Sequence, residues 1–426
     1  MPVLVRAMPV LVRSTRLPRR RSMVAAVALA LGLTGTAATA AGAAHVSPVA
    51  ATASTAPPAP GGRSCPPLAW ALGYSDALDK KVALNAEVGG LSALVKDPRR
   101  HAWAAIEDHS DGQQTRMWFL RDVQGPGDPT VVGTLLLHRA DGTPYDDTDF
   151  DAEGLAVLPD GRYVVTSEVE PSIHIFGRDG TEVGRLRVPD RFRVAPEGEA
   201  TDNATLEGLT ISRDGRTIYA AMEGTLSGDV SPSGDDTFRR IVVYHRHHGH
   251  YRLAKQVGYR IDPGMRIAEV TSYGRDSLLV LEAAWNETDG NTIRLYAATR
   301  LGRAADVSAV PDLGDHPELV APKTAVADVT ACPDLGATAK EAQTNPLMDN
   351  YEAMAITGLN HHAGQQIHGR LAEVVLLSDD NFNDVQTTRV LRLAARLPPS
   401  STAPSTGRAG SAAGEDAALR SIMWPL

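Results

Sequence analysis

The chain has 426 residues, of which 43% are hydrophobic and 22% charged, so it can bury a sizeable core and is neither disordered throughout nor membrane-spanning by composition. Aromatic residues make up only 5%, whereas 38 Gly and 28 Pro favour many short strands joined by turns and exclude a coiled coil. The formal net charge is -9 at pH 7, and the first 43 residues carry six arginines and no acid, which leaves -15 (-9 - 6) for the remainder. A chain this acidic is poorly suited to nucleic acids or anionic membranes, so we expect no nucleic-acid partner.

Residues 1–43 have the pattern of an export signal peptide. Three arginines, Arg19 to Arg21, precede an apolar run over residues 23–33, and the small residues that follow offer Ala-x-Ala cleavage sites. The run is too short for a bilayer span of about 20 residues. We therefore expect a secreted, extracellular protein with no membrane span after cleavage; a retained anchor and twin-arginine export are the alternatives.

Composition divides the rest of the chain into a linker rich in Ala, Pro and Thr over residues 44–64, a folded domain over residues 65–397 and a low-complexity tail over residues 398–426. The domain contains the two cysteines of the chain, Cys65 and Cys332. Thiols oxidise outside the cell, so these cysteines predict one disulfide, with two free thiols as the alternative. Neither cysteine has the spacing of a zinc site.

One phrase recurs along the domain: a carboxylate-Gly-Leu start, a strand, Asp-Gly, a second strand and a final acid. The clearest copies are residues 151–170 (DAEGLAVLPDGRYVVTSEVE) and residues 205–224 (TLEGLTISRDGRTIYAAMEG). Weaker copies are marked by Leu91, Ile267 and Met354. The copies lie about 55 to 65 residues apart, except for a longer last interval that leaves room for one more degenerate unit at residues 319–330.

Each unit places Asp-Gly or a similar turn between apolar runs, which is typical of a β-hairpin, and no convincing helix separates the units. The sequence therefore predicts an all-β fold, a β-propeller of about six blades with five possible, with short loops and little helix. A β-sandwich is the alternative, but a sandwich gives no reason for acids to recur in register.

Residues in register in successive blades surround one axis, so the repeated acids should converge on a central channel. Clustered carboxylates repel one another unless a cation joins them, and oxygen ligands favour Ca²⁺ or Mg²⁺ over zinc. The alternative is that single acids cap loops by accepting backbone N–H bonds. Glu107 is the acid that ends the first unit. We expect calcium as the ion, and the predicted metal ligands are Glu153, Glu168, Glu207, Glu223, Glu282, Glu352, Asp379 and Asp380.

Other signals are weaker. The tract His245 to His250 resembles a metal site but lies between two apolar runs, which favours an exposed hairpin tip. Arg191, before an acidic loop, could bind a phosphate or carboxylate, with a surface ion pair as the alternative. No G-x-S-x-G nucleophile elbow is present, so the sequence gives no support for a serine hydrolase.

Several motifs together resemble the exported phytase-like family, which is labelled as having esterase-like activity. The resemblance covers residues 73–397 and rests on DAEGL at 151–155, LEGL at 206–209, LVLE at 279–282 with Trp285, NYEAM at 350–354, and SDDNF at 378–382 with Gln386.

This resemblance implies a propeller, export and hydrolysis of an ester or phosphoester. We expect a monomer that acts on a small-molecule ester or phosphoester, with channel calcium polarising the substrate and activating water. We assign catalysis to Glu207, Glu282 and Asp379, and substrate binding to Arg191 and Asn381. The alternatives are a non-catalytic propeller that binds a ligand or surface partner around a structural calcium ion, and a lactonase-type propeller.

Overall fold

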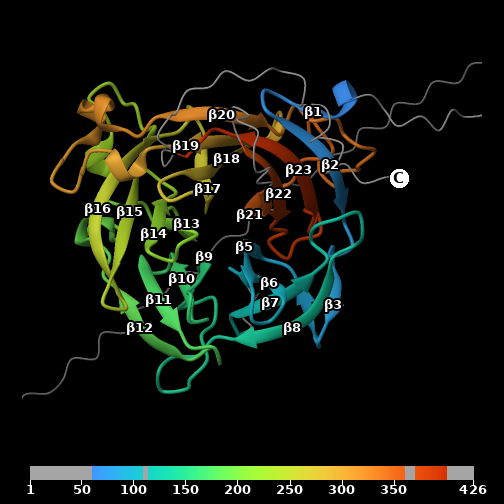
Figure 1. The fold of residues 1–426 in the computed structure, drawn as a ribbon, viewed down its shortest axis with the longest axis horizontal. Helices are drawn as coiled ribbons and strands as arrows, with labels where there is room; N and C mark the ends of the chain where they lie inside the picture. Colours follow the sequence, from blue (N-terminus) through green and yellow to red (C-terminus); the bar gives the residue numbers. More distant parts are fainter. Residues whose placement is uncertain (1–59, 109–113, 360–369, 401–426) are drawn as a thin grey trace, which may run out of the picture. The chain divides into compact units, whose positions relative to one another are not determined.

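The computed structural model describes residues 60–108, 114–359 and 370–400 of the chain. Five antiparallel sheets of four or five strands stand around one axis as the blades of a propeller (Figure 1). The innermost strands β5, β9, β13, β17 and β21 contact one another in that order, and β21 contacts β5 to complete the ring.

Each of the first four blades is a four-stranded meander that runs from the channel outward. Blade 1 comprises β5 (Leu91–Asp97), β6 (Ala102–Glu107), β7 (Arg116–Arg121) and β8 (Thr130–Leu136). Blade 2 comprises β9 (Ala152–Val157), β10 (Tyr163–Ser167), β11 (Ser172–Phe176) and β12 (Glu182–Leu186). Blade 3 comprises β13 (Leu206–Ile211), β14 (Thr217–Met222), β15 (Phe238–His247) and β16 (His250–Arg260). Blade 4 comprises β17 (Arg266–Ser272), β18 (Leu278–Asn286), β19 (Gly290–Ala298) and β20 (Lys323–Asp328).

Blade 5 is assembled from distant parts of the chain. Its inner strands are β21 (Tyr351–Leu359), β22 (Arg370–Ser378) and β23 (Val390–Leu397), and its outer strands are β2 (Ala69–Ser75) and β1 (Ser64–Cys65). The antiparallel pairing of β2 with β23 closes the ring. A separate hairpin joins β3 (Lys81–Ala83) to β4 (Ala86–Val88). The helical segments of the described residues are short 3-10 turns: η1 (Pro60–Arg63), η2 (Asp190–Phe192), η3 (Ser227–Asp229), η4 (Leu301–Arg303), η5 (Leu313–Asp315) and η6 (Pro317–Leu319).

The structure confirms the predicted all-β propeller with little helix and resolves the open blade number at five. All five sequence markers, from Leu91 to Met354, lie on innermost strands. The suggestion of one more unit at residues 319–330 was wrong, because this segment contains β20, the outer strand of blade 4. The extra length of the last interval comes from the loops and 3-10 turns on either side of β20.

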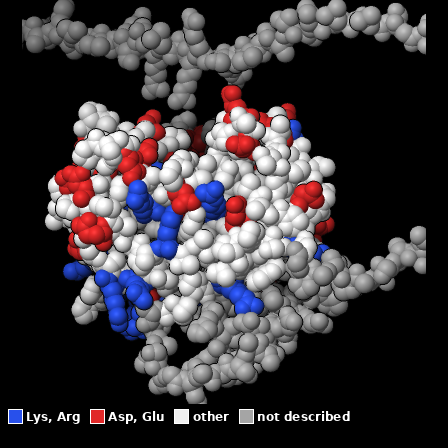
Figure 2. All heavy atoms as spheres, turned by 90° about the horizontal axis from the view of Figure 1, so that it is seen from above, with Lys and Arg blue, Asp and Glu red and all other residues white. Residues whose placement is uncertain are grey.

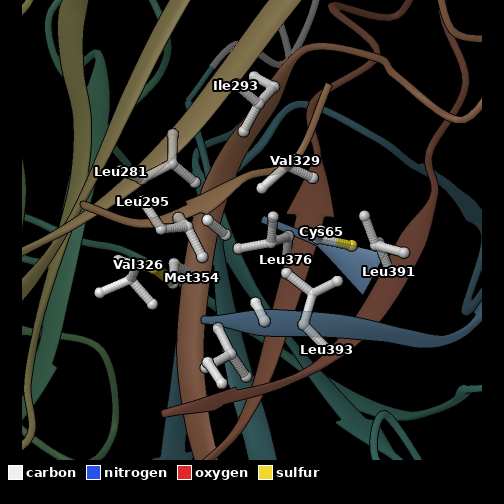
Figure 3. Packing of buried hydrophobic residues seen from close by; sticks show 14 of the residues in the cluster. Cys65, Leu281, Ile293, Leu295, Val326, Val329, Met354, Leu376, Leu391 and Leu393 are labelled. Atoms are coloured by element: carbon white, nitrogen blue, oxygen red, sulfur yellow. The ribbon is translucent and has the colours of Figure 1, made fainter. Parts of the chain in front are cut away.

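The strands read as nearly continuous apolar runs because both faces of most inner strands are buried between blades. On β14, Ile218 and Ala220 pack toward blade 2, whereas Tyr219 and Ala221 pack toward blade 4. Figure 3 shows the corresponding cluster between blades 4 and 5, to which Leu281 on β18 and Leu376 on β22 both belong. Burial of one leucine side chain stabilises the fold by about 1.5–3 kcal/mol. Each interface buries several such side chains, so a change in the angle between two blades would be costly.

The glycines of the repeated Glu-Gly-Leu phrase allow neighbouring inner strands to approach closely. A Cβ on Gly154 would lie 2.5 Å from the carbonyl oxygen of Glu207, and a Cβ on Gly208 would lie 2.7 Å from the backbone nitrogen of Val270. No side chain fits at these distances. The repeated Glu-Gly-Leu sequence therefore marks a close contact between blades as well as the start of a strand.

Several predicted features concern surfaces and segments away from the core. The predicted signal peptide and C-terminal tail lie outside the described residues, except for residues 398–400 of the tail. None of the described helices is long and apolar enough to cross a membrane. The side of the molecule shown in Figure 2 carries interspersed acidic and basic side chains rather than a continuous basic field. The His245 tract is, as expected, largely an exposed hairpin end, where His247 pairs with His250.

The predicted disulfide is present and joins Cys65 on β1 to Cys332 in the loop after β20. It links the outermost strand of blade 5 to blade 4 across 267 residues of sequence. Both cysteines are buried in the cluster between these blades. The crosslink therefore secures the end of the chain that closes the ring.

Replacing both cysteines with serine should lower the free energy of unfolding by about 2–5 kcal/mol, because the unfolded chain gains freedom and the ring closure loses its crosslink. Urea unfolding of the double variant and of the wild type measures this change. Wild type treated with a reductant is the control and should shift in the same direction. Equal midpoints for all three samples would contradict a stabilising role for the disulfide.

Candidate functional site at the channel mouth

Every innermost strand has a β-bulge close to its start, and all five bulges lie at the same end of the channel. The ladder shifts between Leu91 and Ala93 in blade 1, and at matching positions in the other four blades. Bulges redirect side chains and are frequent beside functional sites. Here they bring a repeated set of side chains to the channel mouth.

Three rings of structurally equivalent residues follow from the ladder registers and the adjoining backbone hydrogen bonds. In blade order, the entry ring is Gly90, Asp151, Thr205, Arg266 and Asn350. The bulge ring is Ser92, Glu153, Glu207, Ala268 and Glu352. The strand-end ring is Asp108, Glu168, Glu223, Ala283 and Asp379.

The bulge and strand-end rings together carry seven carboxylates, and blade 4 supplies none of them. Blade 4 has Ala268 and Ala283 at the corresponding positions and contributes Arg266 from the entry ring instead. The guanidinium Nη1 of Arg266 donates to Glu207 at 2.8 Å and to Glu223 at 3.0 Å. Its Nη2 donates to Glu352 and, at 3.2 Å, to the side-chain oxygen of Asn350. One cation thus neutralises the side of the mouth formed by blades 3 and 5.

On the opposite side of the mouth, formed by blades 1 and 2, less of the negative charge is neutralised by cationic side chains. The carboxylate of Glu153 has no hydrogen bond or ion pair to any residue that the structure describes, although it is only 7% exposed. One oxygen each from Glu153, Glu168 and Glu207 lie within 4.8 Å of one another, and the same holds for Asp108, Glu153 and Glu352. The two groups share Glu153. Ca²⁺ binds oxygen ligands at about 2.3–2.6 Å, so oxygens at these separations can surround one ion.

Burial and mutual repulsion raise the pKa of several of these carboxyls. Burial is the main cause for Glu153 and Glu207, followed by the charges of neighbouring glutamates. Burial and the charge of Glu223 raise the pKa of Glu168 to about 8, although the backbone N–H of Thr205 donates to its carboxylate. Burial and the charge of Asp108 raise the pKa of Asp379. Without a bound cation, part of this cluster is therefore protonated at neutral pH.

The structure brings together six of the predicted metal ligands: Glu153, Glu168, Glu207, Glu223, Glu352 and Asp379. Glu282 lies apart, because its carboxylate accepts hydrogen bonds from Tyr259 at 2.7 Å, Lys323 at 2.7 Å and the backbone N–H of Asp262 at 2.8 Å. Asp380 is also engaged elsewhere, with Lys80 at 2.7 Å.

The two predicted substrate-binding residues occupy different places. The backbone N–H of Asn381 donates to Asp379 at 2.8 Å, which places Asn381 beside the channel mouth, and its side chain bonds to Gln386. Arg191 lies in the loop after blade 2, where it pairs with Glu199 at 2.5 Å and donates to the carbonyls of Val310 and Pro311. This is the ion pair that the sequence left as the alternative for Arg191.

Sequence reasoning missed Arg266, Asp108 and Glu269. Glu107 and Glu282 were placed in register with Glu168, but the ladders align Asp108 and Ala283 with Glu168 instead. The error is one residue, and one residue turns a strand side chain to the opposite face. The final acids of the other three units, Glu168, Glu223 and Asp379, do occupy equivalent positions, as the sequence predicted. Glu269 is buried and accepts the backbone N–H groups of Leu209 and Val270, so it joins the inner strands of blades 3 and 4.

A family model described as "Phytase-like: Esterase-like activity of phytase" matches residues 86–382, which include all five inner strands and every residue of the three rings. The chain belongs to this family. The match confirms the resemblance found in the sequence motifs.

Individual relatives of this phytase-like protein are distant. An uncharacterized secreted protein of Arthroderma benhamiae is 29% identical, with 26% of this chain and 34% of that protein covered, so the match spans about a third of the relative's length. Among solved structures, virginiamycin B lyase from Staphylococcus aureus is 8% identical with a TM-score of 0.31 and covers 74% of this chain and 68% of its own. A luciferin-regenerating enzyme is 11% identical with a TM-score of 0.31 and covers 76% and 97%. Similarity this low carries no functional argument.

Replacing Arg266 with methionine should lower the free energy of unfolding by about 3 kcal/mol at pH 7, because three carboxylates lose their shared cation. The difference from wild type should shrink as the pH falls from about 8 toward 4.5, because burial raises the pKa values of Glu207 and Glu223 above the ordinary value and they bind protons in this range. Urea unfolding across this pH range measures the change. Arg266→Lys is the matched control and should fall between the two, since it keeps the charge without the planar fork. A pH-independent loss for Arg266→Met would contradict an electrostatic role.

The metal-free protein should lose stability as the pH rises from 5 to 8. The pKa of Glu168 is raised to about 8 in the folded state, so the folded protein holds this proton more tightly than the unfolded chain does. The resulting stabilisation is complete below about pH 4.5 and disappears as the pH approaches 8. Melting temperatures in EGTA at each pH measure it, and Glu168→Gln should show a shallower decline. Equal slopes for the two proteins would show that Glu168 does not titrate in this way.

Proposed function

We propose that the protein is a secreted hydrolase whose channel mouth binds calcium and cleaves an ester or phosphoester of a small molecule. The observation that carries the proposal is the group formed by Glu153, Glu168 and Glu207, whose ligand atoms lie within 4.8 Å of one another while Glu153 has no partner among the described residues. A buried carboxylate without a partner is unfavourable unless it binds a proton or a cation. Membership of the phytase-like family and the disulfide support hydrolysis and export, respectively.

The donor set fits calcium. All candidate ligand atoms are carboxylate oxygens, which a hard divalent cation prefers, and no His or Cys belongs to either group in the described part of the chain. Glu153, Glu168 and Glu207 would hold one ion, and Asp108 and Glu352 are placed to extend the ligand set around the shared Glu153. A bound calcium ion would polarise the ester or phosphoryl oxygen and lower the pKa of a coordinated water.

The protein's own side chains would orient the reacting groups. Arg266 holds Glu207 and Glu352 in place through its two terminal nitrogens, so these carboxylates keep their positions when the substrate arrives. Asp379 makes no ion pair with Arg266 and is bonded to the N–H of Asn381 and the side chain of Asn350. Of the predicted catalytic residues, Asp379 is therefore best placed to accept a proton from the attacking water.

Glu207 would act as an ion ligand and a fixed charge, because its carboxylate already accepts a hydrogen bond from Arg266. Glu282 is not carried into the mechanism, since its bonds to Tyr259 and Lys323 hold it outside the acid cluster. An anionic phosphoester would be repelled by the cation-free mouth. Turnover of such a substrate should therefore require calcium more strictly than turnover of a neutral ester.

Replacing Glu153 with glutamine should raise the melting temperature of the calcium-free protein and reduce the rise that calcium produces. The first effect follows because one repelling charge is removed, and the second because one ligand charge is lost. Scanning calorimetry in EGTA and in excess calcium measures both effects, with calcium binding measured by titration. At 100 times the dissociation constant, calcium should stabilise the wild type by about 2.7 kcal/mol.

Glu282→Gln is the matched control: it should lower the melting temperature in both buffers and leave the calcium increment unchanged. Hydrolysis of an aryl phosphate, an aryl ester and a lactone is assayed alongside. Calcium-dependent turnover that falls in Glu153→Gln supports the hydrolase and identifies its substrate class. A calcium-dependent melt without turnover would make this a non-catalytic propeller with a structural ion, and the absence of any calcium effect would overturn the metal site.

A further inference from the structure

A serine, a histidine and a glutamate form a linear arrangement on the outer strands of blade 2. Ser172 and His174 lie two residues apart on β11, so their side chains share one face, and Glu182 begins the neighbouring strand β12. The Ser172 hydroxyl lies 2.9 Å from His174 Nε2, and His174 Nδ1 lies 3.4 Å from a carboxylate oxygen of Glu182. Each ring nitrogen of the imidazole thus faces a different partner.

The surroundings hold the imidazole in a fixed orientation. The ring of Phe150 meets His174 edge-on at 4.7 Å between centroids, Phe176 stacks at 6.0 Å, and Tyr145 packs at 5.9 Å. His174 is 3% exposed, and its Nδ1 has no hydrogen-bond partner in the described part of the chain; the Glu182 carboxylate is its ion-pair neighbour at 3.4 Å. With the proton on Nδ1, Nε2 is left as the acceptor for the Ser172 hydroxyl.

The two groups carry different charges at pH 7. Burial, with the charge of Arg185, lowers the pKa of His174 to about 4, so the imidazole is neutral and its unprotonated nitrogen can accept a hydrogen bond. Burial alone would raise the pKa of Glu182, but hydrogen bonds from Arg185 and Tyr145 outweigh it and lower the pKa. Glu182 is therefore ionised, and its charge offsets part of the cost that burial and Arg185 impose on an imidazolium beside it.

We propose that Ser172, His174 and Glu182 form a nucleophile, a base and an orienting carboxylate that hydrolyse a neutral carboxylic ester without a metal ion. Ser172 Oγ attacks the carbonyl carbon while His174 Nε2 takes the hydroxyl proton. The ester C–O bond then breaks, and the leaving alkoxide receives that proton, which leaves an acyl group on Ser172. Water attacks the acyl group, gives its proton to His174 and releases the carboxylic acid, and the proton returns to Ser172 Oγ.

This site is separate from the acid cluster. Ser172 pairs with Ser167 on β10, and Ser167 in turn pairs with Ala152 on the innermost strand. Two strand spacings of about 4.8 Å place the serine backbone roughly 10 Å from the innermost strand. Ser172 is partly exposed, whereas the imidazole beneath it is buried, as expected for a nucleophile approached from solvent. The inference does not depend on calcium binding at the channel mouth.

The test is carried out in EGTA, so that its outcome is independent of the calcium proposal. The wild-type protein is incubated with an alkyl fluorophosphonate, a probe that phosphonylates activated serines, and the product is measured by intact mass and peptide mapping. Hydrolysis of p-nitrophenyl acetate is followed in parallel. We expect one label on Ser172, and a fall of about 100-fold or more in labelling and hydrolysis rates in Ser172→Ala and His174→Gln.

Ser231→Ala is the matched control, because the Ser231 hydroxyl bonds to Ser233 and has no histidine partner among the described residues. It should react like the wild type. Melting temperatures establish that Ser172→Ala is folded, which keeps the test informative if His174→Gln is unstable. An unlabelled wild type, a label on another serine, or equal reaction of Ser172→Ala would overturn the proposal and make the three residues a packing network between blades 1 and 2.

Discussion

Electrostatic repulsion constrains the centre of this propeller, because the inner strands bring seven carboxylates to one end of the channel. Inter-blade packing fixes the strands, so the carboxylates cannot move apart to relieve their repulsion. Arg266 compensates three of them, and protons or cations must compensate others. Blade 4 has alanines at the two ring positions where the other blades have acids or Ser92, which leaves room for the guanidinium. The departure of blade 4 from the repeat therefore reduces the repulsion within the acid cluster that the other four blades form.

The mouth also depends on how the ring closes. Asn350, Glu352 and Asp379 all belong to blade 5, which is completed by strands from the N-terminal side of the domain. The group formed by Asp108, Glu153 and Glu352 therefore draws on blades 1, 2 and 5, and the pairing of β2 with β23 completes the last of these blades. The disulfide holds the outermost strand of this blade against blade 4. Stability at the rim and the geometry of the acid cluster at the centre are thus linked through one sheet.

The fold was predictable because each blade repeats the same strand pattern, and the repeated markers all lie on inner strands. Most of the acid cluster was predictable for the same reason. The errors at Glu107 and Glu282 arose at the ends of the second strands, where an acid lies one residue before the position equivalent to Glu168 and therefore points to the opposite face. Arg266 was missed for a different reason: it breaks the repeat, and a search for similarity gives no weight to the unit that departs from it. Its role follows only from the positions of three carboxylates contributed by other blades.

The arrangement of Ser172, His174 and Glu182 was beyond the reach of motif reasoning. A nucleophile elbow can be recognised in sequence because one strained turn presents the serine, whereas here strand pairing assembles the three groups. The Ser-x-His spacing places two side chains on one face, but any exposed strand could contain it. What distinguishes this copy is the neighbouring strand, which supplies Glu182, and the loop that brings Tyr145 and Phe150 against the imidazole. Blade 2 thus contributes Glu168 to the channel mouth and, four residues later, Ser172 to the proposed serine site. The two proposals differ in that only the one at the channel mouth requires calcium.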